Sequence, residues 1–193
     1  MAKNVALIIG SLRKESFTRR VAMALADLAP KSLTLSPVEI GALPLYNQDL
    51  DDNKQPPREW TAFRDRMKEM EAVIFATPEY NRSVPGVLKN AIDVGSRPYG
   101  SSIWSGKPAG VISVTPGGYG AFGANHHLRQ SLVFLDMPTM QQPEAYLSNI
   151  GNAFDGDKLK DDKTRELLTK FVTAFGEFVE RHAAAREPAR KSA

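Results

Sequence analysis

The sequence of 193 residues contains no cysteine. Disulfides, thiol catalysis and thiolate metal ligands are therefore excluded, and the composition fits a reducing compartment. Histidine is scarce as well, with three residues in the chain. His126 and His127 are adjacent, and neighbouring side chains on a helix diverge, so these two imidazoles are not placed to chelate one metal. We expect no bound metal.

Long apolar runs are also missing, since no stretch approaches the length of about 20 residues that spans a membrane. The chain passes from Met-Ala-Lys-Asn directly into an apolar strand pattern, so we expect no signal peptide. The net charge is only +3, and part of it lies in residues 183–193, which we expect to be a disordered basic tail. No stripe of Lys and Arg interleaved with aromatics indicates nucleic-acid binding. We therefore expect a cytoplasmic protein with neither a membrane nor a nucleic-acid partner.

What the sequence does contain is an alternation of apolar runs and helical patterns. Strands are expected at residues 5–9, 33–35, 72–76 and 109–114 and within 139–145. Helices are expected over residues 19–28, 58–70, 85–95, 125–134 and 162–182, and an irregular segment over 37–57. This alternation within 193 residues predicts one domain over 1–182, an α/β fold with a doubly wound parallel sheet of the short type.

The most informative segment is Gly10 to Thr18, between the first strand and the first helix. Backbone N–H groups and the positive end of a helix form an anion site in this arrangement. Three hydroxyl side chains (Ser11, Ser16 and Thr18) can donate hydrogen bonds, and Arg13 can give a charge-assisted fork to a phosphate. An ordinary helix N-cap is the alternative. A Walker A loop is excluded because Glu15 occupies the place of its second Gly, so the segment suits a single phosphate monoester held without a metal.

Two further loops follow the third and fourth strands. Ligands bind at the carboxyl ends of the strands in such sheets, so these loops and the first one are expected to form one crevice. Residues 77–86 contain two prolines and a closing glycine, and a stiff loop of this kind presents backbone polar groups at fixed positions to a planar heterocycle. A rigid turn that only holds the next helix is the alternative. Residues 115–123 are glycine-rich and allow a backbone to approach a ligand closely.

The glycine-rich loop also matches a dinucleotide fingerprint. Gly118, Gly120 and Gly123 have the G-x-G-x-x-G spacing, and Glu144 follows about twenty residues later. This fingerprint belongs on the first strand of a nucleotide-binding half, whereas only about seventy residues follow here. We therefore disfavour a nicotinamide-dinucleotide domain.

The crevice offers no evident catalytic acid, base or nucleophile. No Ser-His-Asp arrangement or paired-carboxylate site is indicated, and Asp49, Asp51 and Asp52 have the pattern of a solvated turn. Chemistry at such a site is expected to come from a cofactor.

Two motifs, Gly-Ser-Leu-Arg-Lys-x-Ser-Phe at 10–17 and Pro-Glu-Tyr-Asn-x-Ser-Val-Pro-Gly-x-Leu-Lys-Asn-Ala-Ile-Asp at 78–93, occur in this order. In them the sequence closely resembles the NADPH-dependent FMN reductases, and within these the bacterial quinone and chromate reductases. The resemblance runs from residue 5 to 178 and includes 43–49 and 127–130. It implies a flavodoxin-like three-layer sandwich with strand order 2-1-3-4-5. It also implies FMN as cofactor, NADPH or NADH as hydride donor, and quinones, azo compounds or oxyanions such as chromate as acceptors.

The resemblance also assigns roles to residues of the three loops. The FMN phosphate is expected to contact Ser11, Arg13, Ser16 and Thr18. The isoalloxazine is expected to lie against Pro78, Glu79, Tyr80 and Asn81, with Ser113, Gly117 and Gly118 opposite. Phe17 and Ser83 are expected to belong to the cofactor site as well. Two positions depart from the usual pattern, with Glu15 in place of Gly and Thr18 in place of Asn. A carboxylate at position 15 repels a phosphate unless its side chain points outward.

The resemblance also bears on the oligomeric state and on the choice between an enzyme and an electron carrier. Relatives of this kind form dimers that pair into tetramers, and the resemblance places Tyr80, Arg129 and Glu144 in a hydrogen-bond network across the tetramer interface. An intrachain surface pair of Arg129 and Glu144 is the alternative. The rival function is a flavodoxin-type electron carrier, but such carriers tend to be acidic, whereas this chain has a pI near 9.1 and carries Arg13 in the loop. We therefore expect an enzyme that reduces small-molecule electron acceptors by a ping-pong mechanism.

Overall fold

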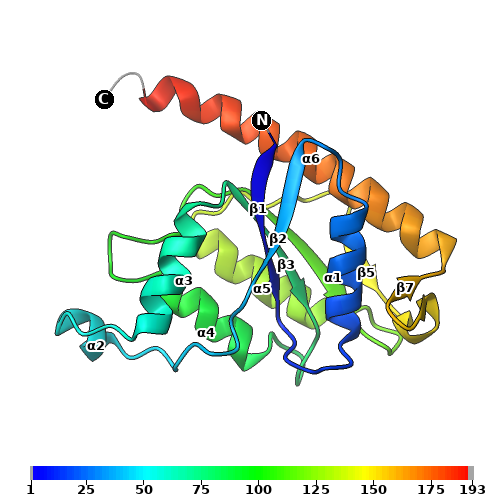
Figure 1. Cartoon of the computed structure of the whole chain (residues 1–193), viewed down its shortest axis with the longest axis horizontal. Coiled ribbons are helices and arrows are strands. Elements are labelled where there is room, and N and C mark those ends of the chain that lie inside the picture. Colours follow the sequence, from blue (N-terminus) through cyan, green and yellow to red (C-terminus); the bar gives the residue numbers. More distant parts are fainter. Residues whose placement is uncertain (1, 191–193) are drawn as a thin grey trace.

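The computed structural model describes residues 2–190, with side chains to residue 183. Its centre is a five-stranded parallel sheet in the order β2-β1-β3-β4-β5, which confirms the predicted topology (Figure 1). The strands are β1 (Lys3–Ile9), β2 (Leu33–Val38), β3 (Ala72–Thr77), β4 (Ala109–Val114) and β5 (Ala145–Leu147). Every residue of β3 and β4 is buried, as expected for central strands that are covered on both faces.

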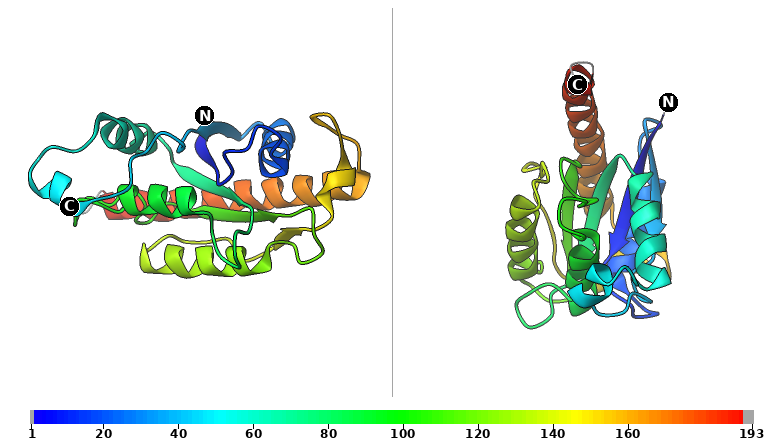
Figure 2. Two further views of the ribbon diagram at one scale, coloured as in Figure 1. Left: turned by 90° about the horizontal axis from the view of Figure 1, so that it is seen from below. Right: turned by 90° about the vertical axis from the view of Figure 1, so that its left-hand side faces the viewer.

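Helices cover both faces of the sheet and complete the three layers (Figure 2). Helices α1 (Phe17–Asp27) and α6 (Asp162–Arg190) pack on the face that carries Leu7 and Ile74. Helices α3 (Arg58–Lys68), α4 (Gly86–Gly95) and α5 (Phe122–Phe134) pack on the face that carries Ile8 and Phe75. Successive strand residues point to opposite faces, so one apolar strand supplies both cores. The flavodoxin-like three-layer prediction is therefore confirmed.

The loops that follow β1, β3 and β4 lie at the carboxyl edge of the sheet, which is the lower edge in Figure 1. Gly10 brings two of these loops together, because its N–H donates to the Ala76 carbonyl at 2.8 Å. A Cβ at position 10 would lie only 3.2 Å from Leu88 and 3.3 Å from Pro78. A side chain at position 10 would therefore push the first loop away from the second.

Two strand boundaries differ from the expectation. Strand β2 continues to Val38 and includes Pro37, which an edge strand tolerates because one side of its backbone needs no ladder partner. Strand β5 covers residues 145–147 and overlaps the expected range only at Ala145. Pro138 and Pro143 lack N–H donors and prevent a regular ladder before it, where Thr139 makes only an isolated bridge to Ala109.

Several shorter elements were missed. The segment 37–57 contains helix α2 (Gln48–Asp52), which Asn47 caps at 3.0 Å. A 3-10 turn η1 (Ile150–Ala153) and a hairpin of β6 (Phe154–Asp155) and β7 (Lys158–Leu159) lie between β5 and α6. Local patterns of two to five residues carry little periodicity, so the sequence does not predict them.

The end of the chain also differs from the expectation. Helix α6 continues past His182, where the helix was expected to end, to Arg190. The disordered basic tail over residues 183–193 stays a prediction. Alanine has the highest helix propensity, and the run Ala183-Ala184-Ala185 extends the helix. The last part of the expected tail, residues 191–193, lies outside the described residues. No helix in the described part of the chain is both long and apolar enough to cross a membrane.

The segment 37–57 is fastened to α3 and α4 by buried polar contacts. The Asn90 side-chain amide donates to the carbonyls of Leu43 and Pro44 at 3.1 and 3.0 Å, and its oxygen accepts from the Tyr46 N–H at 2.9 Å. The Asp51 carboxylate accepts two hydrogen bonds from the Arg64 guanidinium, at 2.8 and 2.6 Å. The prediction of a solvated turn is therefore wrong for Asp51, whose side chain is only 3% exposed.

Candidate active site

The loop between β1 and α1 has an unusual number of free backbone donors. Within the described residues, no N–H group from residues 11–18 donates to a protein acceptor. The first N–H groups of a helix always lack intrahelical partners. Here the free donors begin before the helix, at residue 11 just after β1. Together with the positive end of α1 they form a cradle for an anion.

Three residues of this segment carry hydroxyl side chains and are largely buried. Ser11 and Thr18 are 4% and 3% exposed, and neither hydroxyl has a hydrogen-bond partner among the described residues. Ser16 is the N-cap of α1 and accepts from the Arg19 N–H at 3.1 Å. The N-cap alternative therefore holds for Ser16, although its hydroxyl proton stays available for a ligand.

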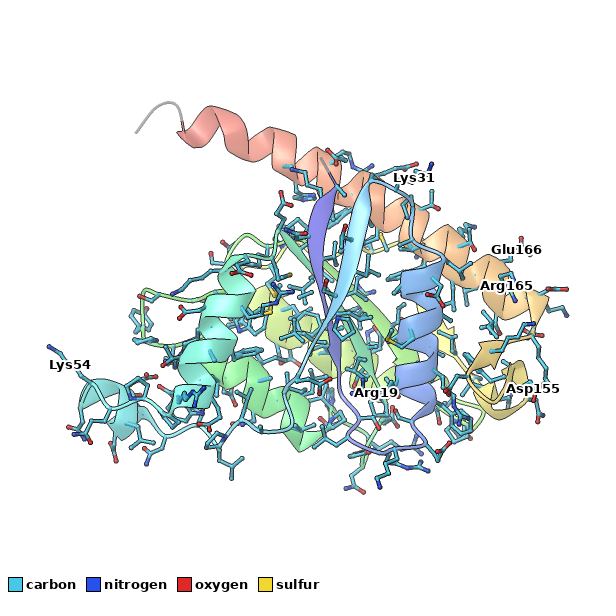
Figure 3. The ribbon with its side chains drawn as sticks, in the orientation of Figure 1. Arg19, Lys31, Lys54, Asp155, Arg165 and Glu166 are labelled. Carbon is cyan, nitrogen blue, oxygen red and sulfur yellow. The ribbon has the colours of Figure 1, made fainter. Side chains whose placement is uncertain are left out.

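The charged residues of the loop point in different directions. Arg13 is exposed, and its guanidinium has no partner in the part of the chain that the structure describes. Glu15 forms an ion pair with Arg20 on α1. The Phe17 ring packs against the core on the α1 side, so this residue contributes only its N–H to the cradle. In Figure 3 Arg19 marks the end of α1 that faces the loop.

The second loop is held by a tight turn. Tyr80 and Ser83 exchange two backbone hydrogen bonds, both 3.0 Å, and the central residues Asn81 and Arg82 have φ values of 52° and 66°. This geometry matches a type I′ turn, in which both central residues adopt the left-handed region. The turn holds the Tyr80 side chain 45% exposed at the carboxyl edge, half-buried Pro78 lies beneath the loop, and the backbone groups between them are fixed.

Glu79 links the second loop to the third. Its carboxylate accepts from the Ala124 N–H at 3.1 Å, at the start of α5, and from Arg82 at 3.4 Å. A carboxylate at a helix N-terminus is stabilised by the free N–H groups and the helix dipole. The Glu79 side chain is 13% exposed and is held by this contact with α5. Its place beside the isoalloxazine stays a prediction.

The Ser113 side chain is completely buried. Its hydroxyl donates to the Gly120 carbonyl at 2.6 Å, and the same oxygen accepts from Asn125 at 3.1 Å. The Ser113 hydroxyl therefore supports the glycine-rich loop, and the place of Ser113 opposite the isoalloxazine stays a prediction. Gly117 and Gly118 are exposed on that loop and remain candidates for the opposite wall.

The glycine fingerprint has a local structural explanation. Gly120 has φ 61°, and a Cβ on it would lie 2.7 Å from that of Tyr146. A Cβ at position 123 would lie 2.8 Å from the Arg82 carbonyl oxygen. Both glycines are therefore required by the packing of the loop, without any dinucleotide.

An open pocket of about 410 Å³ lies between the second and third loops. It is lined by Glu79, Arg82, Tyr119, Phe122 and Gly123. The Arg82 guanidinium carbon lies 5.6 Å from the centroid of the Tyr119 ring, and this ring is 78% exposed. The rim of the crevice thus offers flat apolar surface and one cation.

The two adjacent histidines diverge, as predicted. His127 Nδ1 lies 3.0 Å from the Ser83 hydroxyl, whereas His126 Nε2 lies 3.0 Å from the Tyr146 hydroxyl. That hydroxyl donates to the Glu144 carboxylate at 2.8 Å, and burial, together with this carboxylate, raises the pKa of Tyr146 to about 12. The sequence does not reveal this chain of contacts, because it joins α5 to β5 across about twenty residues.

Arg129 has a different environment from the one expected of a surface pair. It donates to Asn125 at 2.9 Å and to the Met140 carbonyl at 3.0 Å, and its remaining guanidinium nitrogen is buried with no partner among the described residues. Over the described range Glu144 forms no ion pair with it, so the intrachain alternative is wrong.

A larger groove of about 720 Å³ runs between α4 and α5. Its wall includes Ser83, Lys89, Arg97, His127 and Phe134. Phe134 is 84% exposed, and its neighbour Val133 is 75% exposed. Exposed apolar side chains of this size around a groove are typical of a surface that contacts another protein chain.

The cradle of the first loop fits a phosphate monoester. It combines free N–H groups, the unpartnered hydroxyls of two largely buried residues and one uncommitted guanidinium, which are the donors that phosphate oxygens require. Within the described residues no cluster of three or more His, Asp or Glu side chains is placed to hold a metal ion. An FMN phosphate is compatible with this cradle.

The comparisons with known proteins agree with this arrangement. The family model described as NADPH-dependent FMN reductase matches residues 3–152. The chain belongs to this family. It is therefore an oxidoreductase, and the prediction of FMN with NAD(P)H as hydride donor is confirmed at the level of the family.

Individual relatives cover nearly the whole chain. It is 60% identical to a quinone reductase from Pseudomonas putida, over 91% of this chain and 94% of the relative. It is 41% identical to a 2-hydroxy-1,4-benzoquinone reductase from a Burkholderia species, over 93% and 97%. Among solved structures, the flavoenzyme NAD(P)H:(acceptor) oxidoreductase FerB from Paracoccus denitrificans superimposes with a TM-score of 0.87 at 41% identity, over 94% of this chain and 99% of that one.

Proposed function

We propose that this member of the FMN reductase family is an NAD(P)H-dependent quinone reductase. The observation that carries the proposal is the first loop, where free N–H groups, unpartnered hydroxyls and Arg13 surround one anion site at the carboxyl edge of the sheet. Two relatives that this chain matches at 60% and 41% identity are named for quinone reduction. A cytoplasmic location stays a prediction.

Each loop has a distinct task in this proposal. Residues 11–18 bind the phosphate, and the rigid turn at Tyr80–Ser83 presents its backbone groups to the polar edge of the flavin ring. When bound, FMN supplies hydride transfer between NAD(P)H and the acceptor. Gly117 and Gly118 allow close approach from the opposite wall. Pro78, Glu79, Tyr80 and Asn81 remain the predicted ring contacts, and Phe17 and Ser83 the other predicted residues of the cofactor site.

The open rim favours flat acceptors. Tyr80 and Tyr119 are 45% and 78% exposed beside the crevice, and aromatic faces of this kind stack on planar rings. We extend the acceptor range to azo compounds and chromate, because an open site selects acceptors mainly by access and redox potential. The simplest direct test is to follow NADPH consumption by the FMN-loaded protein with a benzoquinone. A flavodoxin-type carrier would show no such consumption although it would still cycle by one electron.

The kinetics provide a second test. If NAD(P)H and the acceptor use the same face of the flavin in turn, double-reciprocal plots at several acceptor concentrations should be parallel. Product inhibition by NADP⁺ should be competitive with the acceptor. Intersecting lines would show that both substrates bind together and would contradict the ping-pong mechanism.

We also propose that the chain forms a homodimer that pairs into a homotetramer. The groove between α4 and α5 and the exposed Val133 and Phe134 support a contact between chains. The buried Arg129 nitrogen without a partner supports a network with Tyr80 and Glu144 from another copy, since a buried cationic donor is costly when unpaired.

Replacement of Arg129 by alanine should therefore shift the protein from tetramer toward dimer and change turnover, because Tyr80 borders the crevice. Sedimentation velocity over a concentration series measures the shift. Glu144→Gln should act in the same direction, whereas Arg66→Ala, a surface residue of α3 paired with Glu69, should leave the assembly unchanged. A wild-type monomer, or an unchanged tetramer in both variants, would contradict the network.

A further inference from the structure

The phosphate-binding loop contains an acidic residue, Glu15, directly before the N-cap Ser16. Its N–H is one of the free donors of the cradle, so its backbone belongs to the anion site. A carboxylate at this place repels a phosphate, and the repulsion depends on where the side chain points. The position of the Glu15 side chain therefore bears on FMN affinity.

Arg20 determines that position. It lies one turn into α1, where its N–H donates to the Ser16 carbonyl at 3.0 Å. Helical side chains lean toward the N-terminus and cover the preceding turn, so the guanidinium reaches back beside the loop. Its Nη2 donates to the Glu15 carboxylate, and its Nε donates to Asp157 at 3.1 Å. Its central carbon lies 5.6 Å from the centroid of the Phe17 ring.

Asp157 comes from the hairpin β6–β7, which packs against α1 (Figures 1 and 3). Arg20 therefore has support from its own helix, from Phe17 and from a separate hairpin, and its side chain is 20% exposed. Glu15 by contrast is 76% exposed and has no other partner among the described residues. The better-held residue of the pair is Arg20, and it fixes the direction of the carboxylate.

We propose that Arg20 is a positioning residue for FMN, which holds the Glu15 carboxylate away from the phosphate cradle. This inference rests on the proposed FMN site at the first loop. It explains how the loop accommodates an acid where the family pattern has a glycine. Arg20 need not touch the phosphate, so its contribution depends on the presence of Glu15.

A double-mutant cycle tests the inference. FMN and riboflavin are titrated by fluorescence against the apoprotein of the wild type, Glu15→Gln, Arg20→Gln and the double variant. Arg20→Gln should weaken FMN binding about three- to fivefold, which is the scale of an exposed charge interaction. Glu15→Gln and the double variant should both bind FMN as the wild type does, because neither has a carboxylate to displace. Riboflavin lacks the phosphate, so its Kd should be the same for all four proteins.

Arg66→Gln is the matched control. It removes an arginine on a different helix, α3, that is paired with a glutamate, Glu69, and leaves the pair of Glu15 and Arg20 intact. Its FMN affinity should equal that of the wild type. Thermal unfolding of each apoprotein shows whether a variant is folded at the titration temperature.

Other outcomes overturn the inference in distinguishable ways. A loss of FMN affinity that persists in the double variant means that Arg20 attracts the phosphate by its own charge. An equal loss with riboflavin means that Arg20 only maintains the fold, and no loss in Arg20→Gln means that Glu15 needs no restraint. If wild-type protein binds riboflavin as tightly as FMN, the first loop is not a phosphate site, and the proposed FMN site fails before Arg20 is considered.

Discussion

Replacement of Asp51 by asparagine should lower the free energy of unfolding by about 3 kcal/mol, because it leaves the Arg64 guanidinium buried without its counter-charge. The two side chains are 3% and 10% exposed and form a two-point contact at 2.8 and 2.6 Å. Arg64 also donates to the Val94 carbonyl at 3.0 Å and lies over the Trp60 ring, so most of its side chain stays buried after the exchange.

Urea denaturation of the apoprotein measures this effect. Asp49→Asn is the control, since Asp49 belongs to the same short helix, carries the same charge and is exposed. It should change the free energy of unfolding by no more than about 0.5 kcal/mol. Equal effects of the two substitutions would show that the Asp51–Arg64 pair contributes no more than surface charge.

The sequence did not distinguish the buried Asp51 from the exposed Asp49, and the structure of this region explains why. Asp51 stands among other acidic and polar residues, which locally indicates solvent. Its partner Arg64 lies on a different helix, and the contact exists only after 37–57 folds back over α3 and α4. Tyr46 in this segment packs against Trp60 at a centroid distance of 5.1 Å, and burial, with the nearby Asp51 charge, raises its pKa. Pairings between distant segments leave no periodic signal in the sequence.

The central sheet was predictable for the opposite reason. The runs that became β1, β3 and β4 are mostly apolar, with Val5–Ile9 and Ala72–Ala76 free of polar residues. Continuous apolar runs of this kind are typical of strands that are covered on both faces of a sheet. β5 was misplaced because it has only three residues and follows a proline. The length of the apolar run, more than its composition, therefore decided which strands were recognised.

The candidate site likewise has one part that the sequence predicts and another that it does not. The phosphate cradle is one continuous segment, so its donors can be recognised together in the sequence. Ser113 belongs to the same predicted crevice, but which groups its side chain contacts depends on how β4 pairs with β5. The contact of Glu79 with the Ala124 N–H likewise depends on how two loops meet. Such roles become visible only in three dimensions.

Replacement of Arg13 by alanine should weaken FMN binding by about 1.5–3 kcal/mol, the scale of a hydrogen bond to a charged group. This corresponds to a Kd roughly ten- to a hundredfold higher. Arg13 is exposed and has no ion-pair partner within the described chain, so its removal should leave the stability of the apoprotein unchanged. A binding defect in a protein of normal stability would separate ligand recognition from folding.

Lys14→Ala is the matched control, because Lys14 is the neighbouring exposed cation of the same loop. Loss of general positive charge would affect both variants alike, whereas a directed guanidinium–phosphate contact requires Arg13 alone. Arg13→Lys should recover only part of the affinity, since an ammonium group lacks the planar fork that binds two phosphate oxygens. Fluorescence titration with FMN and with riboflavin measures these differences, and the Arg13 effect should disappear with riboflavin. An unchanged FMN affinity in Arg13→Ala would remove this residue from the site and leave the phosphate to the N–H groups and hydroxyls of the loop.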